Sequence, residues 1–183
     1  MSKVYFLRHG QSVANAGGVY AGPDSPLTDL GRDQARAAGR KIAGLGIKTV
    51  LTSDLRRAAE TAHLVAEMAG LEPGRVITDP RLRELGVGEL ANTADHGLPG
   101  YLEHQAHPHG DKTVEPVSHA ADRLGSLVKD LAKYDGDILL VSHTGIAQLL
   151  YAILAGESGQ LSRRFDLPNA GLVELPPLKG GRP

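Results

Sequence analysis

Short apolar runs alternate with amphipathic stretches along this chain. Apolar, β-favouring runs begin at Val4 and at Ile138, and each ends in a polar residue that His follows directly. Weaker apolar runs cover residues 49–52, 75–78 and 171–175. Each run has the length and composition of a strand, so the pattern predicts five strands.

Amphipathic stretches follow the first and the second of these strands. Thr28 is the expected N-cap of one helix, which ends near Gly44. Ser53 or Asp54 is the expected cap of the next helix, whose apolar residues lie on one face. Gly70 is its expected stop.

Two more helices are expected at residues 117–131 and at about residues 146–154. The glycine-rich segment 10–26 is predicted to be a loop. Segment 80–116 has several Pro and Gly breaks and no clear period, so it is predicted to be an excursion from the core of the domain. The alternation of strands and helices predicts a single α/β domain over residues 1–175, a three-layer α/β/α sandwich with a mainly parallel central sheet.

Composition narrows the possible partners. The chain has 183 residues, 41% of them hydrophobic, which is enough for one domain with a full core. A net charge of −1 gives no global attraction to nucleic acid or to a membrane, so a bound anion needs a local cluster of cations. No stretch has the length of a membrane span, and no leader pattern opens the chain, so a cytoplasmic protein is expected. The Pro- and Gly-rich tail, residues 176–183, is expected to be disordered.

The chain has no cysteine, so its chemistry cannot use a thiolate or a disulfide. Two imidazoles are candidates for the chemical groups of a site instead, because His9 and His143 both follow the carboxyl ends of predicted strands. Gly10 and Gly145 are expected to let the chain turn sharply there. Ligands of open α/β sheets bind in the crevice outside the carboxyl ends of the strands, so one site built from both ends of the sequence is expected.

Arg56 and Arg57 fall in the first turn of a predicted helix, where each exposed cation costs about 0.3–1 kcal/mol against the helix dipole. One explanation is a solvated pair, partly offset by Asp54 and Glu60. The other is functional, because a guanidinium and a helix N-terminus both favour an anion and together clamp a phosphate or a carboxylate. Arg8 directly follows an apolar strand and also needs an anionic partner if it is buried.

These candidates share one position, just past the carboxyl ends of predicted strands. Two guanidinium groups and two imidazoles around one pocket match a phosphoryl dianion in charge and in number of donors. The set consists of Arg8, His9, Arg57 and His143, with Glu84 in the loop after the third predicted strand.

The motifs around these residues resemble the histidine phosphatase superfamily, also called the phosphoglycerate mutase-like family. The resemblance covers most of the chain, from Leu7 to about Gly145, and five elements occur in the family's order. They are Arg8-His9-Gly10 with Asn15; Ser25-Pro26-Leu27-Thr28 with Gly31 and Gln34-Ala35; Ser53-Asp54-Leu55 with Arg57-Ala58 and Thr61-Ala62; Leu82 with Glu84; and Val141-Ser142-His143-Thr144-Gly145.

This resemblance implies a phosphatase of a small phosphomonoester. His9 is expected to attack phosphorus and become a phosphohistidine. Arg8, Arg57 and His143 are expected to hold the phosphoryl oxygens. Glu84 is expected to act as general acid and then as general base.

For Glu84 to hold a proton near neutral pH it needs an apolar wall or a nearby carboxylate, which Leu82, Leu85 or Glu89 could provide. Further candidates for substrate binding follow from the same resemblance and from the loops around the site. They are Asn15, Tyr20 and Thr144, with the backbone N–H groups of Thr144 and Gly145, and the basic pair Arg163-Arg164.

Departures from the family pattern favour hydrolysis. The mutase branch has an aromatic residue where Ala14 stands and a Tyr-Gly where Leu85-Gly86 stands. The excursion is also short and broken, which gives water access to a phosphohistidine. A cofactor-dependent mutase-type phosphoryl transferase, or a catalytically weak phosphate-binding protein on the same fold, are the alternatives.

No metal or organic cofactor is expected, because arginine and histidine carry the charge that a metal would neutralise. A polar segment rich in histidine lacks metal-ligand spacing and is interpreted as a solvated loop. This segment contains His96, His104, His107, His109 and His119, with Asp95 and Asp111.

The expected partner is a small phosphorylated metabolite. Neither nucleic acid nor a membrane is expected as a partner, and the oligomeric state stays open.

Overall fold

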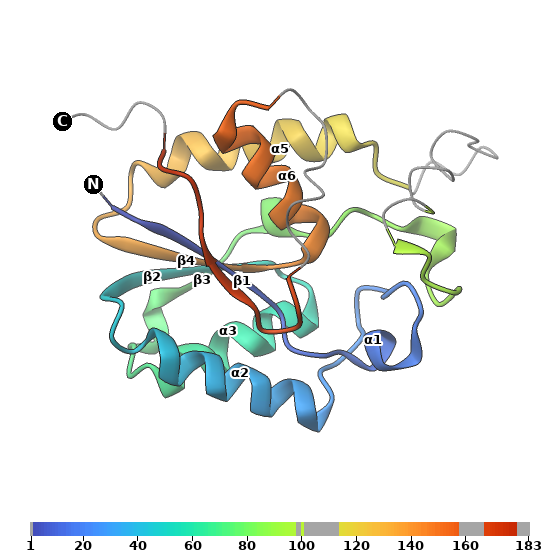
Figure 1. The fold of residues 1–183 in the computed structure, drawn as a ribbon, viewed down its shortest axis with the longest axis horizontal. Helices are drawn as coiled ribbons and strands as arrows, with labels where there is room; N and C mark the ends of the chain where they lie inside the picture. The colour runs from blue at the N-terminus through green and yellow to red at the C-terminus, as the bar shows by residue number, and fades with distance from the viewer. Residues whose placement is uncertain (1, 98–99, 101–113, 158–166, 179–183) are drawn as a thin grey trace.

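Five strands form the central sheet, in the order β3-β2-β4-β1-β5 (Figure 1). The computed structural model describes residues 2–97, 100, 114–157 and 167–178. The first four strands are parallel, and β5 runs antiparallel to β1 at one edge. The strands are β1 (Val4–Arg8), β2 (Ile47–Thr52), β3 (Val76–Thr78), β4 (Asp137–Ser142) and β5 (Leu172–Glu174).

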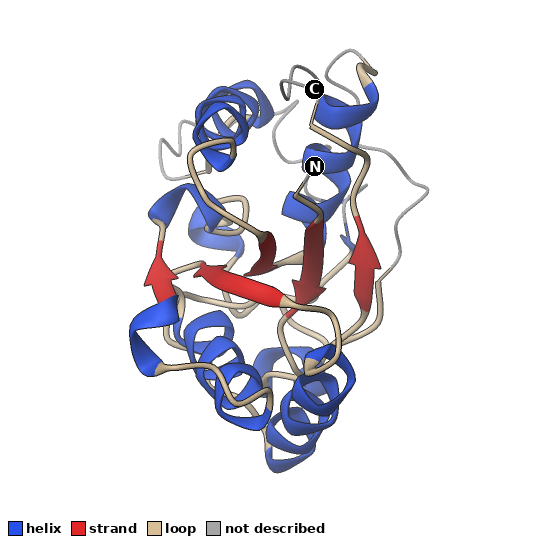
Figure 2. Ribbon diagram, turned by 90° about the vertical axis from the view of Figure 1, so that its left-hand side faces the viewer, coloured by secondary structure: helices blue, strands red, loops and turns tan. Residues whose placement is uncertain are grey.

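Helices cover both faces of the sheet, which confirms the predicted three-layer α/β/α architecture (Figure 2). One layer contains α2 (Asp29–Ile42) and α3 (Arg56–Met68), and the other contains α5 (Val117–Leu131) and α6 (Thr144–Ala155). A short helix, α1 (Val13–Gly17), lies beside the end of β1.

Side chains alternate along each central strand and contribute to two hydrophobic clusters, one on each face of the sheet. Phe6 and Leu140 face the cluster that α5 and α6 complete, whereas Leu7 and Leu139 face the cluster under α2 and α3. All four side chains are fully buried. Because successive residues of a strand point to opposite faces, an unbroken apolar run is what a sheet covered on both sides requires.

The pairing of β1 with β4 sets the position of the candidate site. Arg8 is opposite Ser142, and His9 N donates to Ser142 O at 2.9 Å. His9 and His143 therefore leave adjacent parallel strands at the same edge of the sheet, as the sequence predicted.

Helix boundaries differ from the predictions where side chains have other partners. Thr28 is the N-cap of α2, because its Oγ1 accepts from Gly31 N at 3.0 Å, and the helix ends at Ile42, near the predicted Gly44. The prediction that Ser53 or Asp54 caps α3 was wrong: the cap is Leu55, without a side-chain bond.

A helix also interrupts the predicted loop over residues 10–26. Ser12 and Asn15 form a capping box for α1: Asn15 N donates to Ser12 Oγ at 3.2 Å, and Ser12 N donates to Asn15 Oδ1 at 3.1 Å. Gly18, with φ of +64°, ends the helix. With five residues, α1 is too short to show a hydrophobic period.

The predicted excursion contains short 3-10 turns where the structure describes it, η2 (Pro80–Leu82) and η3 (Gly88–Leu90). A third such turn, η1 (Pro73–Arg75), precedes β3 and covers the first residue of the predicted strand at residues 75–78. Of the predicted tail, Leu178 packs against the core under α5 and α6, and residues 179–183 lie outside the described residues.

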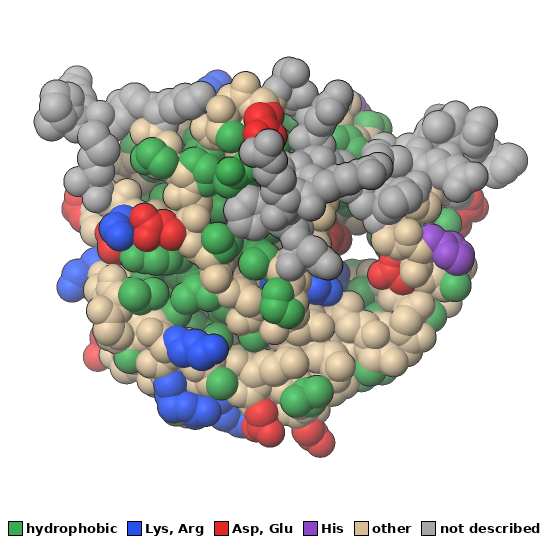
Figure 3. Space-filling model, viewed as in Figure 1, with side chains coloured by type: hydrophobic (Ala, Val, Ile, Leu, Met, Phe, Trp, Pro, Cys, Tyr) green, Lys and Arg blue, Asp and Glu red, His purple; other side chains and the backbone are tan. Residues whose placement is uncertain are grey.

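On the face drawn in Figure 3, basic and acidic side chains of the described residues are interspersed. This distribution fits the net charge of −1 and gives that face no broad field of one sign. Within the described ranges, no helix is long and apolar enough to cross a membrane.

Candidate active site

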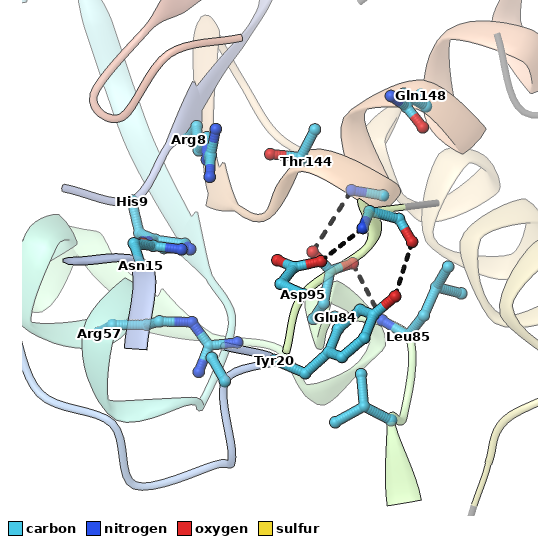
Figure 4. A pocket seen from close by; sticks show the side chains of 14 residues that line it. Arg8, His9, Asn15, Tyr20, Arg57, Glu84, Leu85, Asp95, Thr144 and Gln148 are labelled. Atoms are coloured by element: carbon cyan, nitrogen blue, oxygen red, sulfur yellow. Dashed lines mark hydrogen bonds between the residues drawn. The ribbon is translucent and has the colours of Figure 1, made fainter. Parts of the chain in front are cut away.

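A cavity of about 350 Å³ opens at the carboxyl edge of the sheet (Figure 4). Its walls come from the end of β1, from α1 and the segment after it, from the first turn of α3, from the loop after η2 and from the start of α6. The predicted residues that line it are Arg8, His9, Asn15, Tyr20, Arg57, Glu84, Leu85, Thr144 and Gly145.

His9 is held in one tautomer. Its Nδ1 lies 2.7 Å from the carbonyl oxygen of Gly10, which can only accept, so Nδ1 carries the proton and Nε2 keeps its lone pair. Burial lowers the pKa of His9 well below its usual range, and the Arg57 and Arg8 guanidinium groups lower it further. His9 is therefore a neutral imidazole with a nucleophilic nitrogen.

The backbone around His9 is fixed by α3. Thr61 Oγ1 accepts from Gly10 N at 3.1 Å and donates to the carbonyl of Arg57 at 2.7 Å. Thr61 is fully buried, so these bonds are shielded from water. The Thr61 side chain thus links the loop after His9 to the helix turn that supplies Arg57.

Gly10 is required for close packing, and its φ is not positive. A Cβ at Gly10 would lie 2.3 Å from the carbonyl oxygen of Gly31, and a Cβ at Gly31 would lie 2.1 Å from the carbonyl oxygen of Gln11. The loop after β1 can lie against the start of α2 only because both residues lack side chains.

Arg57 is almost fully buried and faces the pocket without a carboxylate partner among the described residues. Its Nη1 donates to Gly22 O at 3.0 Å, and its Nε is buried without a hydrogen bond. Burial lowers the pKa of this guanidinium, and the neighbouring Arg8 adds to the effect.

The alternative that Arg56 and Arg57 form a solvated pair applies only to Arg56, which is exposed. The acidic residues invoked for that alternative pair elsewhere, Asp54 with Arg83 and Glu60 with Arg32. Arg8 reaches the pocket from the end of β1, where its Nη1 donates to Leu167 O at 2.6 Å.

His143 lies behind His9. The two ring centroids are 5.0 Å apart, and His143 Nε2 lies 3.0 Å from Ser53 Oγ. His143 is fully buried and is not among the residues that line the cavity, although its Nδ1 lacks a hydrogen bond. Burial lowers the pKa of His143 well below its usual range, and Arg57 lowers it further. The structure therefore brings the two imidazoles together but gives only His9 to the cavity surface.

Glu84 is held opposite His9 by two backbone groups. Its Oε1 accepts from Leu85 N at 3.0 Å, and its Oε2 accepts from Gly145 N at 3.3 Å. Burial raises the pKa of Glu84 despite these bonds and the nearby arginines. Leu82 and Leu85 are both buried, so the apolar wall comes from them, whereas Glu89 is exposed.

Gly145 has a different role from the one expected. Its φ is not positive, and a Cβ there would lie 2.7 Å from Glu84 Oε1, so it is the lack of a side chain that matters. Its N–H donates to Glu84 and is not left for a phosphate. Ser142 Oγ donates to Leu82 O at 2.6 Å and ties the loop that carries Glu84 to β4.

The other predicted substrate contacts also lie in the cavity. Asn15 Oδ1 accepts from Ser12 and from Asn169 Nδ2, the latter at 3.2 Å, so its oxygen serves the loop structure. Tyr20 OH donates to Gly97 O at 2.8 Å. Thr144 Oγ1 is buried without a hydrogen bond, and it lines the cavity at the start of α6.

Several lining residues were not predicted: Ala21, Val87, Asp95, Gly97 and Gln148. Asp95 belongs to the segment interpreted as a solvated loop, and no sequence spacing relates it to Tyr20. The pair Arg163-Arg164 lies outside the described residues, as do His104, His107, His109 and Asp111 of the proposed polar loop. Within the part of the chain that the structure describes, no three His, Asp or Glu residues form a group that could hold a metal.

A neutral imidazole between two guanidinium groups, opposite a carboxyl group of raised pKa, defines a site for phosphoryl transfer on an α/β fold. The amino-acid sequence agrees with this class: residues 4–182 match the histidine phosphatase superfamily (branch 1), and the chain belongs to that family. Phosphorylated small molecules are the typical substrates of this family.

Relatives and solved structures bear two kinds of name. The chain is 34% identical over 185 residues to a protein of Serratia proteamaculans named "Probable phosphoglycerate mutase GpmB", covering 96% of this chain and 85% of that protein. The structure of the alpha-ribazole phosphatase from Shigella flexneri superposes with a TM-score of 0.77 at 27% identity, over 93% of this chain and 88% of that one. A mycobacterial glucosyl-3-phosphoglycerate phosphatase gives a TM-score of 0.76 at 26% identity, over 95% and 92%.

Proposed function

We propose that this protein is a phosphatase that hydrolyses a small phosphomonoester through a phosphohistidine on His9. The observation that carries the proposal is the bond from His9 Nδ1 to the Gly10 carbonyl, at 2.7 Å. It directs the lone pair of the ring to Nε2, in a cavity that Arg8 and Arg57 also line. A neutral nucleophile beside two cations suits attack on a dianionic phosphoryl group.

In the first step, His9 Nε2 forms a bond to phosphorus while the bond from phosphorus to the ester oxygen breaks. Glu84 gives its proton to the departing alkoxide, which is a poor leaving group without it. The raised pKa of Glu84 keeps more of the group protonated than an ordinary glutamic acid would be. Arg8 and Arg57 stabilise the charge on the phosphoryl oxygens.

In the second step, a water molecule attacks phosphorus and the bond to His9 Nε2 breaks. Glu84, now ionised, takes a proton from that water, and inorganic phosphate leaves with the imidazole restored. The alternation of Glu84 between acid and base needs a carboxyl group opposite the nucleophile, and Figure 4 shows Glu84 across the pocket from His9.

His143 supports His9 from behind in this proposal. Its ring lies 5.0 Å from that of His9, and its pKa is lowered, so it does not add a repelling positive charge next to Arg57. When the unpartnered Nδ1 of His143 carries the ring proton, it is a further donor for a phosphoryl oxygen, and Nε2 then accepts from Ser53 Oγ.

Two departures from the mutase pattern favour hydrolysis over mutase activity. Ala14 and Leu85-Gly86 stand where mutases carry an aromatic residue and a Tyr-Gly. The names of the relatives support both activities: two solved structures at 26–27% identity are named as phosphatases, and the relative at 34% identity is named as a probable phosphoglycerate mutase.

Single-turnover trapping with a phosphoglycerate separates the two activities. Phosphate release that keeps pace with consumption of the ester supports a phosphatase, whereas transfer to a second phosphoglycerate that outpaces phosphate release replaces the proposal with a mutase. Activity on p-nitrophenyl phosphate with and without His9→Ala tests the enzyme itself. Equal rates for the two proteins would leave only a phosphate-binding protein.

A further inference from the structure

The charges in the cavity are divided between its two sides. Arg8 and Arg57 lie on the side of His9, whereas Glu84 and Asp95 lie on the opposite side (Figure 4). Among the described residues that line the cavity, these two arginines are the only lysine or arginine side chains. Both are committed to the phosphoryl group in the proposed reaction, so the remainder of the substrate meets the acidic side.

Asp95 is exposed on the cavity wall, and a network of hydrogen bonds places it there. Its backbone N donates to Gly18 O at 2.9 Å, and its Oδ1 accepts from Gly97 N at 2.7 Å. Tyr20 OH donates to Gly97 O at 2.8 Å, which closes the network on the other side of the loop. The carboxylate therefore has a defined position in the cavity wall.

Backbone pairing anchors this loop to the segment after α1. Val19 and Ala94 form an isolated antiparallel bridge, and Tyr20 N donates to Thr93 O at 2.9 Å while Asn92 N donates to Tyr20 O at 2.8 Å. Asn92 adopts a positive φ of 66° where the loop turns. Asp95 and Tyr20 thus belong to one hydrogen-bonded unit of the cavity wall.

We infer that Asp95 selects the alcohol portion of the substrate: it favours a neutral polyol or a cationic group that donates hydrogen bonds, and it disfavours a second anionic group. The inference rests on the proposed phosphatase function and names its substrate class. A fixed carboxylate accepts bonds from hydroxyl or ammonium groups, whereas it repels a carboxylate or a second phosphate. Phosphoglycerates and bisphosphoglycerates carry that second charge.

The experiment compares two esters that differ in one group. Glycerol 3-phosphate carries a hydroxymethyl group where 3-phosphoglycerate carries a carboxylate. We expect kcat/KM to favour glycerol 3-phosphate by about tenfold, the effect of two unit charges about 6 Å apart at an effective dielectric constant of about 40. Asp95→Asn removes the charge and keeps an oxygen for Gly97 N, so the ratio should fall to about one.

The ratio of the two esters within one variant cancels any general loss of activity or folding. Asp33→Asn is the matched control, because Asp33 is an exposed carboxylate on α2 that pairs with Arg36 away from the cavity. An unchanged ratio in Asp95→Asn, or a wild-type preference for 3-phosphoglycerate, would overturn the inference. Added salt should also reduce the wild-type preference.

Failure of the proposed phosphatase function is distinguishable from failure of this inference. If neither ester nor p-nitrophenyl phosphate is hydrolysed, the phosphatase function fails. The same two esters are then compared as ligands by calorimetry, with His9→Ala and with His9→Ala combined with Asp95→Asn. A binding preference for glycerol 3-phosphate that disappears with Asp95→Asn supports the charge selection, and equal affinities in both proteins refute it.

Discussion

Replacement of Glu84 by Gln separates the acid role of this residue from its structural role. Both carboxylate oxygens accept backbone bonds, from Leu85 N at 3.0 Å and from Gly145 N at 3.3 Å. Gln keeps the shape of the side chain, but its amide NH2 must face one of these two donors, and it has no proton to give to an alkoxide.

The loss of one backbone hydrogen bond and the loss of the general acid differ in their effect on the rate. One neutral hydrogen bond contributes about 0.5–1.5 kcal/mol, which corresponds to a change of roughly twofold to tenfold. A general acid contributes a factor of about 10²–10⁴, or about 3–5 kcal/mol of transition-state stabilisation. The chemical loss therefore dominates wherever the leaving group needs a proton.

Two substrates report these losses separately. We expect Glu84→Gln to lower kcat/KM for glycerol 3-phosphate by about 10²–10⁴-fold. The loss for p-nitrophenyl phosphate should stay below about tenfold, because nitrophenolate leaves without protonation and only the backbone bond is affected. The parameter kcat/KM covers the steps up to the phosphohistidine, so the later base role of Glu84 does not enter.

Glu67→Gln, at an exposed position of α3, is the control and should match the wild type on both esters. Thermal unfolding of each variant checks that the fold is retained. Losses of equal size on the two esters would refute the acid role of Glu84 and assign the proton to another group.

Arg57→Lys keeps a buried cation but loses the planar guanidinium that donates to a backbone carbonyl, so kcat/KM for p-nitrophenyl phosphate should fall about 10²-fold. The control Arg56→Lys, at an exposed position, should retain wild-type kinetics. Similar kinetics for the two variants would argue against a phosphate clamp. Gly10→Ala would place its Cβ 2.3 Å from the backbone oxygen of Gly31 and should lower the free energy of unfolding by about 1–3 kcal/mol in urea titrations. The control Gly125→Ala lies inside α5 with nothing within 4 Å of its Cβ and should raise that free energy by about 0.4–1 kcal/mol, so a loss there would contradict the packing argument. Burial lowers the pKa values of His9 and His143 below the unfolded value of 6.5, so the unfolded chain binds more protons than the folded chain in acid. As the pH drops under about 6.5, the free energy of unfolding should therefore decrease by up to about 1.4 kcal/mol per pH unit for each imidazole. Equal urea midpoints at about pH 7 and about pH 5 would show that the imidazoles are not buried in neutral form.

The fold was predictable where burial alone determines the pattern. The runs that begin at Val4 and Ile138 are apolar without alternation because both faces of the sheet are covered, and their polar ends mark its carboxyl edge. The positions of His9 and Arg57 follow from those strand ends and from the first turn of α3. These features are local in sequence.

Features that depend on tertiary contacts were missed. Ser53 looks like an N-cap, but its hydroxyl lies against His143 and accepts from Leu55 N before the helix begins. Asp95 enters the cavity through pairing between segments far apart in the chain, which no local period encodes. The burial of His143 behind His9 depends on the register of β1 with β4.

The strand order has a consequence for how the protein is assembled. Strands β1 and β2 are the first to be synthesised, yet they do not pair with each other, because β4 lies between them. A nascent chain that stops before residue 137 leaves these two strands without their common neighbour and leaves His9 without the imidazole against which it packs. The candidate site can therefore be complete only after β4, a strand from the last third of the chain, takes its place between β1 and β2.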